Sequence, residues 1–250
     1  MTDSIKSKII NICIAFLSIV FIYLISLLLY YLKNNDLAFP HPNNIIVETL
    51  NLLKLSQTYK ALFFSVLRLL LCICLSLIIA FILATLSFRF SYFKKIINPY
   101  ITIFRTLPLI SIIVLLIITV GTKISAFVVT VLVLAPLIYQ NVLEGLESVP
   151  EDIVNAYRLD SKFNINVLFK LYVPQIVPSI KTALISSIGL GFKVLVMSEF
   201  ISGTYYSLGY SLKDSYQNNI EMVYVYAWTL ILIIISLIIT KICDFLQEKK

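Results

Sequence analysis

The stretch from Glu144 to Pro174 reads EGLESVPEDIVNAYRLDSKFNINVLFKLYVP and is the longest polar segment of the chain. Strongly apolar segments precede and follow it. Ser148 and Glu151 stand at the spacing of a capping box, and Pro150 falls in the first turn, where its missing N–H does least harm. The pattern predicts that a helix begins here, outside the bilayer.

Apolar residues recur along this predicted helix, at Val149, Ile153, Ala156 and Tyr157, so that one face is apolar. An Asp-Ser pair at residues 160–161 interrupts it, and a second apolar pattern follows. We therefore expect a short helix, a turn and another short helix. Two interpretations are open from the pattern alone: the segment lies on the lipid surface as an amphipathic helix, or it docks on a partner.

The composition places the chain among multi-pass membrane proteins. Its 250 residues are 60% hydrophobic and 13% charged, with a mean hydropathy of +0.96, far from the values of soluble domains. The net charge of +7 does not imply nucleic-acid binding in a protein of this class. What matters is where the lysines and arginines lie, because their positions predict which loops are cytoplasmic. All four cysteines lie in or beside apolar segments, and His41 has no metal-ligand spacing around it. We expect no disulfide, metal, cofactor or cleavable signal.

Six apolar segments are predicted to be transmembrane helices, and the first of them is long enough to cross about 30 Å of hydrocarbon at roughly 1.5 Å per residue. They are Ile9–Leu32, Ala61–Leu86, Leu109–Val120 extended backwards past Pro108, Ile124–Tyr139, Ile176–Ile201 and Met222–Ile242. The expected fold is all-α, with six transmembrane helices and with the polar loop, residues 144–174, between helices 4 and 5. Residues 1–60 hold the first helix and an interfacial segment, Ile45–Leu55, and residues 61–250 form the transmembrane core.

The lysines and arginines predict which side of the membrane each loop occupies. If the N-terminus is in the cytoplasm and the chain changes sides at each span, 13 of the 20 Lys and Arg residues lie on the cytoplasmic side and 5 on the outer side. Arg68 and Lys193 then lie within the membrane. Because positive residues are enriched in cytoplasmic loops, both termini and the central polar loop are expected in the cytoplasm.

Of the charged residues inside the predicted spans, Arg68, Lys193 and Glu199 are candidates for a role within the membrane, whereas Lys181 and Lys241 are counted with the cytoplasmic side. A charge at mid-bilayer costs ~3 kcal/mol on insertion scales, so each should face protein or water. Lys193 and Glu199 are too far apart in helical phase to pair within one helix. Lys193 is open to lining a path through the membrane, to an ion pair with another helix or chain, or to snorkelling, and Arg68 is open to snorkelling toward the outer interface or to marking a path or a paired site.

Within the central loop, Asn155-Ala156-Tyr157 is followed by Ser161 and then by Leu171-Tyr172-Val173-Pro174. This spacing resembles the Glu-Ala-Ala loop of bacterial ABC importer permeases, with Asn155 in place of Glu and Ser161 in place of Gly. Two further stretches resemble the nitrate, sulfonate, taurine and thiamine-precursor branch of that family: Phe104-Arg105-Thr106-Leu107-Pro108, preceded by Arg68 and a basic loop, and Tyr206-Ser207-Leu208-Gly209.

The resemblance implies a type I importer fold whose central loop is a coupling helix docked on a separate ATP-binding subunit. It assigns the coupling contacts to Pro150, Ile153, Asn155, Ala156, Tyr157, Ser161 and Pro174. It also implies that Lys193 and Glu199 lie near the translocation path, with Arg68 as a further candidate.

The resemblance also implies partners and a location. In members of the family, two permeases assemble with two ATP-binding subunits. An extracytoplasmic binding protein delivers the solute to them. We expect a homodimer or close heterodimer in a bacterial inner membrane, moving a small polar or anionic solute by alternating access. Sulfonates, taurine, nitrate and a thiamine precursor are all open. The outer segments, residues 33–60 and 202–221, would receive the binding protein.

The chain itself is not expected to be an enzyme. It has no glycine-rich phosphate-binding loop and no paired catalytic residues inside a span, so ATP hydrolysis is assigned to another subunit. The alternative function is a self-contained secondary transporter. Such a carrier would need intramembrane carboxylates or broken helices in matched halves, and no internal repeat is visible.

Overall fold

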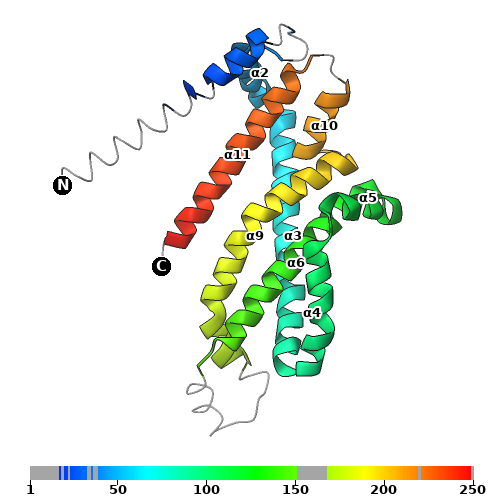
Figure 1. Ribbon diagram of the computed structural model, residues 1–250, viewed down its shortest axis with the longest axis vertical. Coiled ribbons are helices and arrows are strands. Elements are labelled where there is room, and N and C mark those ends of the chain that lie inside the picture. The colour runs from blue at the N-terminus through cyan, green and yellow to red at the C-terminus, as the bar shows by residue number, and fades with distance from the viewer. Residues whose placement is uncertain are drawn as a thin grey trace, which may run out of the picture.

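The computed structural model describes residues 39–150, 168–218 and 221–248, together with residues 17, 20, 21, 23–32 and 35. Every regular element within these residues is a helix, which confirms the all-α prediction (Figure 1). The elements are α2 (Pro42–Lys54), α3 (Ser56–Arg89), α4 (Ser91–Thr106), α5 (Leu109–Val120), α6 (Thr122–Glu147), the π-helical turn η1 (Leu168–Tyr172), α9 (Val173–Ser202), α10 (Leu208–Asn218) and α11 (Val223–Glu248).

Four of the described helices are long and apolar enough to cross a membrane: α3, α6, α11 and the continuous η1–α9 segment Lys170–Ser202. A fifth span results if α4 and α5 are counted together. The first predicted span, Ile9–Leu32, lies partly outside the described residues, and within it Tyr23–Leu32 forms an apolar helix. The count of six spans therefore stays a prediction.

α4 and α5 do not form one straight helix. They meet at 101° across Leu107 and Pro108, so the predicted extension of the third span backwards past Pro108 is wrong in its geometry. Pro108 has no N–H to donate, and its ring disfavours the helical conformation in the residue before it. Leu107 accordingly has extended backbone angles, φ −63° and ψ 137°, and the chain turns before α5 begins.

The centre of the fold is the packing of α6 against α9 and α3 (Figure 1). Several of the largest fully buried side chains belong to α6 and α9, among them Leu134, Ile138 and Leu146 on α6 and Ile176 and Leu195 on α9. The outward faces of α3 and α11 carry large exposed apolar side chains, as expected where helices contact lipid. α6 and α9 are thus the helices that the other elements surround.

The two helices that flank the central loop run further into it than the sequence pattern predicts. α6 continues to Glu147 because its last polar side chains lie on the exposed side of the helix, and the chain is helical again from Leu168. Ser148 closes α6, since its hydroxyl donates to the Gly145 carbonyl at 2.8 Å. The helix predicted to begin at Pro150 lies outside the described residues.

The interfacial segment predicted at Ile45–Leu55 is the helix α2. His41 caps its N-terminus, because Nδ1 accepts the backbone N–H of Asn43 at 3.2 Å. The tyrosine-rich segment that follows α9 contains the short helix α10. α2, α10 and the start of α11 all lie at the end of the molecule opposite the end of α6 and the start of η1, and we call this the outer end (Figure 1).

Gly145 sets how closely α6 and α9 cross near the loop. A Cβ at Gly145 would lie 2.8 Å from the Cβ of Ser179, whereas a Cβ at Gly189 would meet nothing within 4 Å. We expect Gly145→Ala to reduce the free energy of unfolding by roughly 1–3 kcal/mol through overpacking. The matched change Gly189→Ala should leave it equal or slightly higher, because alanine favours helix. Thermal unfolding in detergent, followed by Trp228 fluorescence, checks both. Equal midpoints for Gly145→Ala and the unmodified protein would contradict the close crossing.

Candidate coupling and translocation sites

The predicted coupling segment is joined to the two central helices. α6 ends and η1 begins at the same end of the molecule (Figure 1). Pro150 and Pro174, two of the predicted coupling residues, are exposed there. The remaining predicted contacts lie outside the described residues, so their role stays a prediction. They are Ile153, Asn155, Ala156, Tyr157 and Ser161.

A buried ion pair lies toward the outer end. The carboxylate of Glu199 on α9 is fully buried, and Arg68 on α3 donates to it through Nη1. The hydroxyl of Ser65, one turn before Arg68, lies 3.0 and 2.8 Å from the two carboxylate oxygens. The guanidinium and the hydroxyl together offset the cost of removing the carboxylate from water. Arg68 and Glu199 therefore stabilise each other's charge inside the bundle.

The same carboxylate fixes the start of α10. Its Oε2 accepts the backbone N–H of Gly209 at 3.3 Å, while the Ser65 hydroxyl oxygen accepts the N–H of Leu208 at 3.0 Å. These N–H groups lie in the first helical turn, where they lack intrahelical partners and favour negative charge. A Cβ on Gly209 would lie 2.5 Å from the backbone nitrogen of Phe200 and 2.6 Å from the Cβ of Glu199. Only glycine allows this approach.

The sequence pattern identified part of this cluster. Arg68 and Glu199 are both path candidates from the sequence, and the structure joins them in one ion pair. Ser65 was missed because it carries no charge, and Gly209 was identified only as part of the stretch Tyr206–Gly209, without its contact to Glu199. One signal for Ser65 was available, since it precedes Arg68 by one turn and therefore shares its helix face. Whether any of these residues meets a solute stays a prediction.

Lys193 lies on a different side of α9 from Glu199, as the spacing predicts. Its side chain is exposed and borders an open groove of about 390 Å³ between α9, α10 and α11. The other walls are mainly apolar and include Val196, Leu212 and Leu232. Among the described residues, no hydrogen bond or ion pair involves Lys193. The structure thus separates Lys193 from the Arg68–Glu199 pair.

A polar seam joins α4 to α6 toward the loop end. Lys94 and Glu147 form an ion pair at 2.5 Å, and Arg105 donates to the Gln140 side chain. The amide of Gln140 donates in turn to Glu144 at 3.1 Å. No sequence pattern indicates this seam, because Lys94 and Glu147 are 53 residues apart in the chain.

Aromatic side chains surround a hollow of about 570 Å³ at the outer end, among them Tyr205, Tyr210 and Trp228. Lys60 and Asp214 add one charge of each sign to its lining. The rings of Tyr205 and Tyr210 lie 4.6 Å apart. Partial burial, and then the neighbouring Tyr205 and Asp214, raise the pKa of the Tyr210 phenol above its ordinary value. Its hydroxyl therefore stays protonated and can donate a hydrogen bond.

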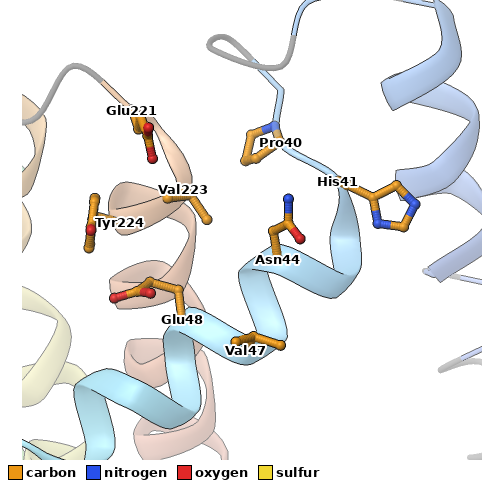
Figure 2. A pocket seen from close by; sticks show the side chains of 8 residues that line it. All are labelled: Pro40, His41, Asn44, Val47, Glu48, Glu221, Val223 and Tyr224. Atoms are coloured by element: carbon orange, nitrogen blue, oxygen red, sulfur yellow. The ribbon is translucent and has the colours of Figure 1, made fainter.

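A second hollow of about 400 Å³ lies between the starts of α2 and α11 (Figure 2). Asn44, Glu48 and Glu221 contribute its polar groups, whereas the imidazole of His41 points away from it. The His41 ring instead packs edge-on against Tyr30, with centroids 5.0 Å apart. Within the described residues, no group of three His, Cys, Asp or Glu side chains could hold a metal ion.

Apolar spans around a buried ion pair, with a polar loop at one end, define a multi-pass membrane protein. The family model described as binding-protein-dependent transport system inner membrane component matches residues 73–249. The chain belongs to this family.

Two curated relatives are bicarbonate transport system permease proteins. The chain is 28% identical over 79 residues to the bicarbonate transport system permease protein CmpB of Synechocystis sp., covering 32% of this chain and 28% of that protein. It is 27% identical over 95 residues to CmpB of Synechococcus elongatus, covering 38% and 34% respectively. The chain thus aligns with about a third of the length of these relatives.

Solved transporters share the fold. An amino acid ABC transporter with histidines gives a TM-score of 0.62 at 16% identity, over 80% of this chain and 98% of that chain. The MetNI methionine ABC transporter in an inward-facing conformation gives 0.60 at 16% identity, over 78% and 98%.

The buried pair generates a stability prediction. We expect Glu199→Gln to lower the free energy of unfolding by about 3–5 kcal/mol, because it leaves the Arg68 guanidinium without a counter-charge. The double variant Glu199→Gln with Arg68→Gln should be more stable than Glu199→Gln alone. Unfolding of each variant in detergent by heat or denaturant measures the differences.

The Lys94–Glu147 pair provides the matched control, since its side chains are 34% and 44% exposed. Glu147→Gln should cost only about 0–1 kcal/mol, because solvent screens an exposed pair. If Glu199→Gln unfolded at the same midpoint as Glu147→Gln, the buried pair would not be the stabilising contact described here.

Proposed function

We propose that the chain is the membrane-spanning permease subunit of an ATP-driven ABC importer, with ATP hydrolysis on a separate subunit. The observation that carries the proposal is the family match over residues 73–249. The placement of the polar loop supports it, because the loop joins the two helices at the centre of the fold.

The helices beside the loop are arranged to carry a movement of the loop into the bundle. α6 and α9 pack against each other, with Gly145 close to Ser179. Tyr172, at the end of η1, is buried and contacts the ring of Phe88 on α3, with centroids 5.1 Å apart. Because close-packed interiors transmit displacement, a shift of the coupling segment would move α3, α6 and α9 together.

In the proposed mechanism, ATP closes two ATP-binding subunits, draws two coupling segments together and opens the path outward. Hydrolysis reverses the change, so nucleotide state and helix arrangement bias each other reciprocally. One copy of the loop engages one ATP-binding subunit, which requires a second permease as a homodimer or close heterodimer. The outer segments, including the aromatic hollow around Tyr205 and Trp228, would receive the extracytoplasmic binding protein.

The proposed location is a bacterial inner membrane with both termini and the loop in the cytoplasm. The excess of lysine and arginine on that side supports this orientation. We propose a small anion as the solute, because Lys193 is a membrane-embedded cation with no described counter-charge. The bicarbonate permeases among the relatives are in keeping with this class.

Reconstitution tests whether transport depends on ATP. Proteoliposomes with the permease, its ATP-binding subunit and its binding protein should accumulate at least one of labelled bicarbonate, nitrate or an alkanesulfonate, and only with ATP on the side of the membrane that carries the ATP-binding subunit. Liposomes lacking the ATP-binding subunit are the control. Uptake of the same solute at the same rate without that subunit would contradict the importer and support a secondary transporter.

A bulky residue on the docking face should disrupt coupling. We expect Ala156→Trp to reduce the amount of ATP-binding subunit retained on an affinity-tagged permease in mild detergent by at least about tenfold, an affinity loss of ~1.4 kcal/mol. Arg158→Trp adds the same bulk about 200° away around the predicted helix and should retain the subunit. Full retention by Ala156→Trp would show that this face does not dock.

A further inference from the structure

α4 has an apolar face and a polar face, and the polar face is the one that meets α6. The large apolar side chains of the other face are exposed, as expected next to lipid. They are Tyr92, Ile96, Tyr100 and Ile103. At 100° per residue, Lys94, Asn98 and Arg105 fall on the opposite side of the helix. The attachment of α4 to α6 is therefore largely polar.

The polar seam between the two helices has contacts at three successive levels of α4. The Lys94–Glu147 ion pair lies at one end and the Arg105–Gln140 hydrogen bond at the other. Between them, the Tyr139 hydroxyl lies 3.2 Å from Oδ1 of Asn98. Polar contacts of this kind depend on distance and angle, so they fix one helix against another more strictly than apolar contacts do. The seam therefore determines how α4 lies on α6.

Apolar packing holds α4 only weakly. None of its residues, all of which the structure describes, is fully buried. Ile97 and Ile101 are half-buried and pack against the main core. At its start, the single residue Phe90 joins α4 to α3, with extended backbone angles of φ −124° and ψ 104°. The tilt of α4 about this turn thus depends largely on the polar seam.

The two ends of the polar seam lie beside the coupling segment and the bend. Glu147 is the last residue of α6 and comes three residues before Pro150, the first predicted coupling contact. Arg105 comes three residues before Pro108, where α4 and α5 meet at 101°. A displacement of the coupling segment therefore reaches one end of the seam directly, and the bend lies at the other end.

α5, beyond the bend, is also lightly held. Of its residues, all of which the structure describes, Ile113 is the one that is fully buried. Ile113 forms a small apolar cluster with Val129 and Val194, separate from the main core. Gly121 joins α5 to α6 with φ +84°, a conformation that favours glycine. The contacts of α5 are few enough for it to follow a tilt of α4.

We propose that the polar seam makes α4 follow α6 when the coupling segment moves, so that the movement reaches the bend at Pro108 and α5. This inference rests on the proposed importer function, in which α3, α6 and α9 move together. Lys94 and Arg105 on α4, with Gln140 and Glu147 on α6, are then positioning residues for transport that need not touch the solute. Without them, the three packed helices would move and α4 would be left behind.

A distance between two spin labels tests the inference without knowledge of the solute. All four native cysteines are first replaced by alanine, and Ile78→Cys on α3 and Ile103→Cys on α4 carry the labels. Both side chains are exposed, and they lie 12 and 13 residues from Phe90, so they are at similar levels of the two joined helices. An excess of unlabelled permease leaves one labelled copy in most complexes. The complete complex in lipid nanodiscs is measured by electron paramagnetic resonance with and without the non-hydrolysable ATP analogue AMP-PNP.

Charge reversal disrupts the polar seam without altering the coupling segment. The reversed seam carries Lys94→Glu and Arg105→Glu, which place carboxylates against Glu147 and the side-chain oxygen of Gln140. The swapped seam adds Gln140→Lys and Glu147→Lys and restores the attraction. We expect AMP-PNP to shift the label distance in the reversed seam, because α4 no longer follows α6. The distance should stay unchanged in the unmodified protein and in the swapped seam.

Lys95→Glu is the matched control. It reverses a charge in the same turn of α4 but away from α6, where the ammonium group of Lys95 lies 5.9 Å from the centroid of the Tyr92 ring. AMP-PNP should leave the label distance unchanged in this variant. The amount of ATP-binding subunit retained should be equal in all variants.

Three results would overturn the inference in complexes that retain the ATP-binding subunit. One is that AMP-PNP leaves the distance unchanged in the reversed seam, even if the distribution is broader with and without the nucleotide, as a purely structural role would produce. Another is an equal shift in the unmodified protein. The third is a swapped seam that still behaves like the reversed one. Failure of the importer itself looks different, because the permease would then retain no ATP-binding subunit.

Discussion

A carboxylate enclosed by apolar helices stays ionised only where a cation and hydrogen-bond donors compensate it. Glu199 of α9 meets this requirement with groups from two other elements: Arg68 and Ser65 of α3, and the first turn of α10. The outer parts of α9 and α3 and the start of α10 are therefore positioned by one electrostatic requirement. A movement at the outer end must keep this cluster together or leave a charge unpaired.

α9 has two faces with different tasks in the proposed permease. One face buries Glu199 and Leu195 against the bundle, and the other exposes Gln175, Thr182, Ser186 and Lys193. The same helix begins directly after the coupling segment, next to the contact between Tyr172 and Phe88. A single helix would thus connect the site of ATP coupling to the wall of the path. Movement of the coupling segment would then change which side chains of α9 face the solute.

Hydropathy and charge were sufficient to predict an all-α membrane fold, four of its spans and the interfacial helix α2.

They were insufficient at Pro108, where the bend depends on the missing proline N–H and not on hydropathy. They also ended α6 too early, because polar residues such as Glu144 and Glu147 can stay in a helix when they face outward. Arg68 and Glu199 could be identified as site candidates because they are charges inside apolar spans. The contact of Gly209 with Glu199 could not be predicted, because it depends on how closely α10 approaches α9.

The most direct test of an importer permease is to purify the chain in mild detergent from the membranes in which it is naturally made and to identify the accompanying proteins by mass spectrometry. The expected result is an ATP-binding subunit and an extracytoplasmic binding protein, and the ligand carried by that binding protein would identify the solute. Recovery of neither, in a preparation that keeps other membrane complexes intact, would contradict the importer and leave the central loop as a helix on the lipid surface.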